Sequence, residues 1–470
     1  MRQFAIILIL FSNYSLVLHA QSNEKANQKL FSLLSSDHTG IKFNNLIKDT
    51  KSANITLYSN FYGGAGVGVG DLNNDGLQDI YFAGNQVADK LYLNKGGLKF
   101  EDITAKAGIS WDGGWSSGVV MGDVNNDGLT DIYVTRELYD DKPLLRANKL
   151  YINKGNLKFV NEADAYGVAD TARTRHASFI DFDKDGDLDL LLLNQPPNPG
   201  DYSPYYGTEL IQPKYGIKLL QNIGSSFIDI TEKAGLKRTG FPNSVIASDL
   251  NGDGWTDLFI SNDFWIEDWM FLNNGDGTFT EKIHQNVNHI SFSSMGVDAG
   301  DINNDGMLDL MVVDMVAEDN YRIKANMSGM NPDAFWKVVN EGGHHQYMFN
   351  MLHYNTGNAQ FSDIAQLAGV ASTDWSWSSL FADFDNDGWK DLFITNGLMR
   401  DIRNKDAHKT FAHTVESSLA EYLKTHPNPP ADLSIWDIID LEKTLSVTPS
   451  VKLKNYIFKN NGDLTFTKKM

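Results

Sequence analysis

Carboxylate and amide side chains recur at a fixed spacing in six short loops of this chain. Each loop follows the pattern Asp-x-Asn/Asp-x-Asp-Gly-x-x-Asp, which places oxygen-bearing side chains at positions 1, 3, 5 and 9 and glycine at position 6. Positions 1, 3, 5, 7 and 9 of such a loop can converge on one hard cation, position 7 through its backbone carbonyl. Glycine allows the sharp turn that brings the two ends of the loop together. The pattern therefore predicts cation-binding loops.

The candidate ligands are the residues at these five positions of each loop. The first two loops offer Asp71, Asn73, Asp75, Leu77 and Asp79, and Asp123, Asn125, Asp127, Leu129 and Asp131. The next two offer Asp181, Asp183, Asp185, Asp187 and Asp189, and Asp249, Asn251, Asp253, Trp255 and Asp257. The last two offer Asp301, Asn303, Asp305, Met307 and Asp309, and Asp383, Asp385, Asp387, Trp389 and Asp391.

All of these ligands are oxygen donors, and none is His or Cys, which favours calcium over zinc or copper. Magnesium is the alternative, but it demands a tighter octahedral cage. An EF-hand is excluded, because no loop has Glu at position 12 and no helix is expected on either side. We predict up to six Ca²⁺ ions.

Short apolar runs rich in β-branched and aromatic residues flank the loops and predict β-strands. Strand A precedes each loop, as at 66–70, and strand B follows it, as at 79–83. Strand C comes next, for example at 91–96. A fourth element, D, starts at a recurring phenylalanine and runs on into segments such as 101–109; residues 30–41 resemble a spare copy of it. The recurring residues are Phe100, Phe159, Phe227, Phe279, Phe361 and Phe466.

Four-stranded units repeated every 52 to 82 residues are typical of a β-propeller. We predict an all-β fold, a β-propeller of six four-stranded blades, with small helical insertions on one face. The alternative is an incomplete seven-bladed ring of a longer protein.

The loops and their flanking strands resemble FG-GAP/VCBS repeats, the blades of integrin-α-type propellers. Residues 373–402 (TDWSWSSLFADFDNDGWKDLFITNGLMRDI) are similar to a stretch of secreted VCBS-repeat proteins of Bacteroidetes, which are related to proteins with an ASPIC/UnbV domain. The resemblance covers residues 30–470. It implies calcium in the A–B loops and an extracellular context of cell adhesion or glycan handling.

The first twenty residues predict a secretory signal peptide, residues 1–20, which leaves 21–470 as the propeller. Arg2 precedes the apolar run 5–18, and a small residue, Ala20, stands at the expected cleavage site. A membrane anchor is the alternative, but the run is short and polar residues interrupt it. The chain has no cysteine to carry a lipid. We therefore expect a secreted, cell-surface or periplasmic protein without stable membrane insertion.

The formal net charge is −20, and 20 aspartates stand at positions 1, 3, 5 and 9 of the loops. Six Ca²⁺ ions would bring the formal charge to −8. The acidity is thus mostly a property of the loops, and it argues against a nucleic-acid partner.

The long connections join strands B and C, and antiparallel topology places them on the face opposite the cation loops. Variable loops on a rigid scaffold often carry binding sites, so we expect a glycan or a cell-surface or extracellular protein to bind there. Aromatic side chains of this face are candidate ligand contacts. They are Trp111, Trp115, Tyr205, Trp265, Trp269 and Trp375. The alternative is that these rings pack between blades.

Helical apolar spacing over 405–425 ends before the breaker at 426–430, and a second short helix is expected within 431–446. This helical insertion, about 400–450, is expected to cap the sixth blade; docking of a partner on it is the alternative.

A calcium-dependent, lyase-like enzyme acting on polysaccharide is the alternative function. His176, Lys324, His344 and His345 are candidate catalytic groups, but the adjacent histidines have neither metal nor triad spacing. A cation enclosed by aspartates is also more typical of a structural site than of a catalytic one. We therefore expect a binding or adhesion module rather than an enzyme.

Overall fold

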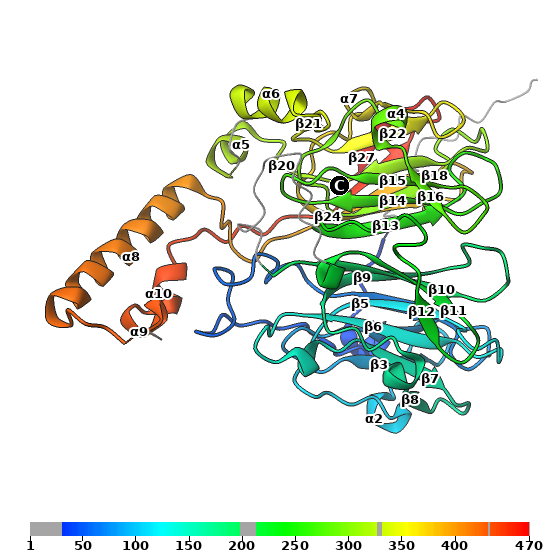
Figure 1. Ribbon diagram of the computed structural model, residues 1–470, viewed down its shortest axis with the longest axis horizontal. Coiled ribbons are helices and arrows are strands. Elements are labelled where there is room, and N and C mark those ends of the chain that lie inside the picture. The colour runs from blue at the N-terminus through cyan, green and yellow to red at the C-terminus, as the bar shows by residue number, and fades with distance from the viewer. Residues whose placement is uncertain (1–30, 198–212, 327–330, 431–432, 470) are drawn as a thin grey trace, which may run out of the picture. The chain divides into compact units, whose positions relative to one another are not determined.

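The computed structural model describes residues 31–197, 213–326, 331–430 and 433–469 (Figure 1). The chain separates into two compact units, Met1–Leu34 and Ser35–Met470, and every sheet among the described residues lies in the second. The predicted signal peptide, residues 1–20, lies outside the described residues. Within the described residues, no helix is both long and apolar enough to cross a membrane.

Six antiparallel meanders follow one another along the chain, and we number them sheets 1 to 6. Sheets 1 to 3 comprise β1 (Val67–Gly70), β2 (Asp79–Phe82), β3 (Lys90–Asn94) and β4 (Phe100–Asp102); β5 (Trp115–Gly122), β6 (Asp131–Glu137), β7 (Lys149–Asn153) and β8 (Phe159–Asn161); and β9 (Arg173–Ile180), β10 (Asp189–Gln195), β11 (Lys218–Asn222) and β12 (Phe227–Asp229). Sheets 4 to 6 comprise β13 (Pro242–Ser248), β14 (Asp257–Asn262), β15 (Trp269–Asn273) and β16 (Phe279–Glu281); β18 (Val297–Gly300), β19 (Asp309–Val312), β22 (Met351–Asn355) and β23 (Phe361–Asp363); and β24 (Asp374–Ala382), β25 (Asp391–Asn396), β26 (Tyr456–Asn460) and β27 (Phe466–Lys469).

Three short strands extend this pattern. Strand β20 (Met315–Val316) adds to β24 at the edge of sheet 6, and β17 (Ile290–Ser291) pairs in parallel with β21 (Gln346–Tyr347). The predicted all-β repeat fold is confirmed as a propeller-like array of four-stranded sheets.

Each strand pairs with its neighbour in the chain, so the A–B loops and the C–D turns lie along the same edge of their sheet. The side chains show this contact directly. Gly275 and Gly462, in the C–D turns of sheets 4 and 6, lie against the rings of Trp255 and Trp389 in the A–B loops. The long B–C insertions leave from the opposite edge, as predicted.

The core consists of apolar layers between neighbouring sheets. Between sheets 2 and 3, for example, Tyr133 and Leu150 pack with Leu190 and Leu192. A larger cluster joins sheets 5 and 6 to the segment 53–62, whose Phe61 is fully buried. The segment before the first strand is therefore part of the core.

Strand D is short, and the residues after it fold as a helical turn. Examples are α2 (Thr104–Ala107) and α3 (Ala163–Tyr166); α4 (Ile283–Asn286) and α7 (Ala365–Ala368) are similar. The turn after β4 ends at Gly108, whose φ is +89° and whose Cα lies so close to the Phe159 carbonyl of the next sheet that a Cβ would collide with it.

The N-terminal turn α1 (Ser36–Thr39) ends in the same way at Gly40, against the carbonyl of Phe100 in sheet 1. Residues 36–40 thus take, on sheet 1, the place that the terminal turn of the preceding sheet takes elsewhere. This explains the sequence similarity of residues 30–41 to element D.

Sheets 1 and 6 each present apolar side chains to solvent. Val67 and Val69 on β1 are 52% and 56% exposed, and Leu380 on β24 is 49% exposed. In the interior of the array, the corresponding faces are covered by a neighbouring sheet. The seven-bladed alternative is not tested by these exposures and stays a prediction.

Helices occupy the B–C insertions. The predicted helix at 405–425 is confirmed as α8 (Lys405–Thr425), which packs against α5 (Asn320–Asn326), α9 (Ile435–Ile438) and α10 (Leu441–Leu445) (Figure 1). Helix α6 (Pro332–Asn340) was not predicted. Two 3₁₀ turns, η2 (Pro143–Arg146) and η4 (Pro213–Tyr215), complete the elements of the part of the chain that the structure describes.

Candidate metal centre

The carboxylate at position 1 of each loop accepts hydrogen bonds from the loop's own backbone. In the first loop, Asp71 accepts from the amides of Asp75 at 3.2 Å and Gly76 at 2.7 Å. In the fifth, Asp301 accepts from Asp305 at 3.1 Å and Gly306 at 2.8 Å. These bonds wrap the backbone around the carboxylate. Glycine at position 6 has a φ of +82° to +92° in all six loops, as the predicted turn requires.

The carboxylate at position 9 is buried and braces the loop against strand C. Asp131 is fully buried, and it accepts from the amide of Val124 at 3.1 Å and from that of Asn153 at 2.8 Å. Burial above all, together with the carboxylates of Asp127 and Asp123, raises its pKa to about 6 despite these two hydrogen bonds. The same causes raise the pKa of Asp189 to about 7. A cation in the loop would offset this crowding of negative charge.

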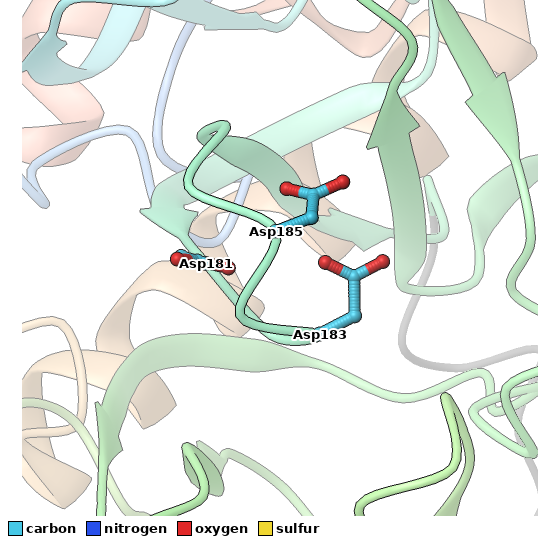
Figure 2. Close-up of side chains that lie close together, drawn as sticks. All are labelled: Asp181, Asp183 and Asp185. Atoms are coloured by element: carbon cyan, nitrogen blue, oxygen red, sulfur yellow. The ribbon is translucent and has the colours of Figure 1, made fainter.

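In the third and sixth loops, three carboxylates lie close together. Carboxylate oxygens of Asp181, Asp183 and Asp185 lie within 4.8 Å of one another (Figure 2), and so do those of Asp383, Asp385 and Asp391. Among the described residues, Oδ1 of Asp181, Asp183 and Asp385 are buried atoms without a hydrogen-bond partner. Buried acceptors without donors are costly. This donor set therefore fits a hard divalent cation.

The residue at position 3 divides the loops into two kinds. In the first, fourth and fifth loops it is an asparagine whose amide donates to the carboxylate at position 5, as from Asn73 to Asp75 at 3.0 Å and from Asn303 to Asp305 at 2.7 Å. The third and sixth loops have aspartate there instead, and a side chain from strand C supplies the donor. Gln221 donates to Asp183 at 2.7 Å.

In the sixth loop this donor is charged. The ammonium of Lys459 lies 2.6 Å from Asp387 and also pairs with Asp385. The hydrogen bond to Asp385, which contributes most, and the one to Asp387 hold the pKa of Lys459 above its ordinary value.

The side chain at position 4 contacts the next loop along the chain in several sheets, a feature that was not predicted. Asn74 donates to the carbonyl of Gly128 in the next loop at 2.9 Å, and Asn304 donates to that of Gly388 at 3.1 Å. Lys184 lies 4.0 Å from the ring centre of Trp255. The only sequence signal was the type of residue at position 4, since asparagine tolerates the left-handed φ of 59° seen at Asn74.

Neighbouring sheets are joined through the asparagine that ends strand C. Asn153 donates from Nδ2 to the carbonyl of Leu72, at position 2 of the preceding loop, at 2.9 Å. The equivalent bonds are Asn222 to Val124, Asn273 to Phe182, Asn355 to Leu250 and Asn460 to Ile302, at 2.8 to 3.0 Å. In sheet 1, Asn94 donates to the carbonyl of Gln78 in its own sheet.

The six aromatic residues proposed as ligand contacts occupy different environments. Trp115, Trp269 and Trp375 are buried, between 1% and 5% exposed, and pack in the core. Trp265 is half-buried, Trp111 is 49% exposed, and Tyr205 lies outside the described residues. The packing alternative therefore describes the three buried rings. Trp111 and Trp265 remain candidates.

Exposed aromatic rings on α5 and α6 were missed. Trp336 and Tyr321 are 55% and 74% exposed, and the ring of Phe335 lies 5.1 Å from that of Trp336. His345 lies beside the same two rings. The signal for α6 was present, because Asn331 caps the helix through the amides of Asp333 and Ala334 and proline stands at its first turn.

The other candidate catalytic groups occupy different surroundings. His344 is buried, with Nε2 3.0 Å from the carbonyl oxygen of Val287, and burial lowers its pKa. Burial, with Arg175 beside it, lowers the pKa of His176 to about 4. Lys324 lies exposed on α5.

The comparisons with known proteins agree with the repeat architecture. A family model described as FG-GAP-like repeat matches residues 71–134, 249–312 and 334–394. Each match begins at or before a cation loop and includes it.

Two curated relatives are cartilage acidic protein 1 of human and of Xenopus tropicalis. The chain is 26% identical to the first over 208 residues, which are 43% of this chain and 29% of the relative. It is 28% identical to the second over 135 residues, 28% of this chain and 20% of the relative. The chain thus spans less than a third of either. Among solved structures, the biofilm matrix protein Bap1 of V. cholerae is 14% identical with a TM-score of 0.33, covering 66% of this chain and 40% of that one.

Proposed function

We propose that this FG-GAP repeat protein is a secreted binding module in which calcium in the six A–B loops stabilises the sheet array and the opposite face binds a glycan or protein. Calcium is structural in this proposal. The repeats are of an adhesion-like, integrin-like type, which supports a binding function. Secretion is proposed from the sequence of residues 1–20.

The observation that carries the calcium proposal is the chemistry inside the loops. Every side-chain donor is an oxygen, the position 9 carboxylates are buried beside others, and buried oxygens of Asp181, Asp183 and Asp385 have no donor. Calcium supplies two positive charges and accepts six to eight oxygen ligands at flexible geometry, so one ion satisfies all three conditions.

The fold separates an ion in the A–B loops from a ligand bound on the opposite face. The A–B loops and the B–C insertions lie at opposite ends of the strands, and the loops bond to strand C and to one another. A calcium ion would therefore fix the scaffold without touching the ligand. This separation distinguishes a binding module from a calcium-dependent enzyme, in which the ion contacts the substrate.

The exposed rings on α5 and α6 are the proposed contact surface. Trp336 and Tyr321 provide flat aromatic area, and His345 beside Trp336 provides polar groups. Such rings suit the apolar face of a sugar or an anchor residue of a protein. Trp111 offers a second exposed ring in a D–A connection on the same side of the sheets.

Binding of the purified chain to a glycan array and to a panel of extracellular proteins tests the proposal. We expect a calcium-dependent signal that Trp336→Ala abolishes, whereas Val160→Ala, at an exposed position on strand D of sheet 2, preserves it. A signal that survives Trp336→Ala unchanged would place the contact elsewhere. Release of sugar products from a polysaccharide would contradict the non-catalytic assignment.

A further inference from the structure

The residue before the strand-C asparagine faces the cation loop of its own sheet in sheets 3, 5 and 6. Gln221 bonds to Asp183, the hydroxyl of Tyr354 accepts from Asn303 at 3.1 Å, and Lys459 pairs with Asp385 and Asp387. The residues at this position in sheets 1 to 6 are Leu93, Ile152, Gln221, Leu272, Tyr354 and Lys459. Lys459 is therefore the one charged residue in the set.

The positive charge of Lys459 contacts a loop that has an additional negative charge. The third and sixth loops alone have aspartate at position 3, which gives each a fourth carboxylate among positions 1, 3, 5 and 9. In the third loop a neutral side chain, Gln221, contacts the extra carboxylate. In the sixth, the ammonium of Lys459 offsets it.

We propose that Lys459 makes the sixth loop a weaker divalent-cation site than the third, and that it keeps the sixth loop attached to strand C when no ion is bound. The inference rests on the proposed binding of calcium in these loops. The third and sixth loops then have unequal affinities and fill in that order.

The geometry indicates weakening rather than loss of the site. Lys459 engages Oδ2 of Asp385 and Oδ2 of Asp387. The buried Oδ1 of Asp385 has no hydrogen-bond partner, and ligand oxygens of Asp383, Asp385 and Asp391 still lie within 4.8 Å of one another. A cation entering there meets three oxygens and, beyond them, a fixed positive charge.

Repulsion between a divalent ion and an ammonium about 5 Å apart in a water-like dielectric weakens binding by about tenfold. The third loop lacks this repulsion and also has a fifth carboxylate at position 7, Asp187. We therefore expect the third loop to fill at the lower calcium concentration.

The ion pairs between Lys459 and the sixth loop do not require a bound cation. It joins β26 to the A–B loop in sheet 6, whose outer face is open to solvent at Leu380. We expect this sheet to keep its loop ordered at calcium concentrations that leave the sixth site empty.

Reciprocal exchange of the two strand-C residues tests the inference by calorimetric Ca²⁺ titration of the whole chain. Lys459→Gln gives the sixth loop the residue of the third, and we expect one site to tighten by about tenfold or more. Gln221→Lys does the reverse and is expected to weaken one site to a similar degree. Lys459→Arg keeps the charge and serves as the control, with affinities close to those of the wild type.

Terbium emission excited through tryptophan assigns the change to a loop. Trp389 stands at position 7 of the sixth loop, so the part of the signal lost in Trp389→Leu reports that loop. We expect this part to rise at a lower Tb³⁺ concentration in Lys459→Gln than in the wild type.

Unchanged site affinities in both Lys459→Gln and Gln221→Lys would overturn the inference, and so would tightening in Lys459→Arg equal to that in Lys459→Gln. If the wild type bound no Ca²⁺ at any site, the proposed function itself would fail, which is a distinguishable result. Should Lys459→Gln not fold, the outcome for Gln221→Lys decides.

Discussion

Asn153 of sheet 2 donates from Nδ2 to the carbonyl oxygen of Leu72, in the first cation loop of sheet 1, at 2.9 Å. Its backbone amide donates to Asp131, the position 9 carboxylate of its own loop, at 2.8 Å. One residue thus connects two successive loops. The elements that gather carboxylates are therefore also the elements that join the sheets, so an ion that orders a loop also orders an interface.

Replacing the strand-C asparagine with alanine should therefore lower the free energy of unfolding by different amounts in sheet 2 and in sheet 1. Asn153→Ala leaves the buried carbonyl of Leu72 without its donor and should lower the free energy of unfolding by about 1–3 kcal/mol. Asn94→Ala removes an equivalent side chain that bonds only within its own sheet, to Gln78 and Gly96, and it should cost less. Urea unfolding of the two variants measures the difference. Equal losses would show that the bond between sheets contributes nothing.

The two ends of a loop should respond differently to removal of a carboxylate. Asp309 is buried and accepts from the amides of Ile302 at 3.0 Å and Asn355 at 2.8 Å. Asp309→Ala is therefore expected to destabilise the fold by about 2–4 kcal/mol in EDTA as well as in calcium.

Asp305, at position 5 of the same loop, is exposed and is the matched control. Asp305→Ala should leave stability in EDTA nearly unchanged and remove part of the stabilisation by calcium. Thermal melts of both variants with and without Ca²⁺ check this. A large loss for Asp305→Ala in EDTA would mean that position 5 is structural rather than a ligand.

Asp268 should make the protein less stable as the pH rises. Burial raises its pKa to about 8, although the amide of Asn262 and the hydroxyl of Ser294 donate to it. The folded state therefore holds a proton that the unfolded state releases near pH 4. Between these values stability falls by about 1.4 kcal/mol per pH unit for such a group.

Asp268→Asn should remove that slope. Sheets 2 and 5 have asparagine at this position. The Oδ1 atoms of Asn148 and Asn350 accept hydrogen bonds from the backbone amides of Arg136 and Asp314, respectively. The replacement is thus one that the repeat already accommodates. Urea midpoints of wild type and variant at pH 5 and pH 8, in saturating Ca²⁺, give the comparison. Parallel pH profiles would contradict the assignment.

The strands and loops could be predicted because their signals are local. Strands A and B directly flank a nine-residue pattern, and glycine at position 6 fixes the turn. The terminal turns were less clear, because segments such as 104–107 continue from a strand but consist of helix-forming residues that end at a glycine.

The remaining features depend on contacts between residues far apart in the chain. Trp115 is buried because Phe61 packs against it, with ring centres 5.1 Å apart, and no local pattern distinguishes it from the exposed Trp111. The bond from Asn74 to Gly128 likewise requires two loops to lie side by side. Such features follow from the register of neighbouring sheets, which the spacing of motifs does not specify.

The most direct test of calcium as the structural ion of the six loops is the thermal melt of the purified chain in EDTA, in Mg²⁺ and in Ca²⁺. Each site filled at one hundred times its Kd stabilises the folded state by about 2.7 kcal/mol. We therefore expect Ca²⁺ to raise the Tm by more than about 5 °C over EDTA, with a smaller rise in Mg²⁺. The same Tm in EDTA and in Ca²⁺ would contradict the proposal.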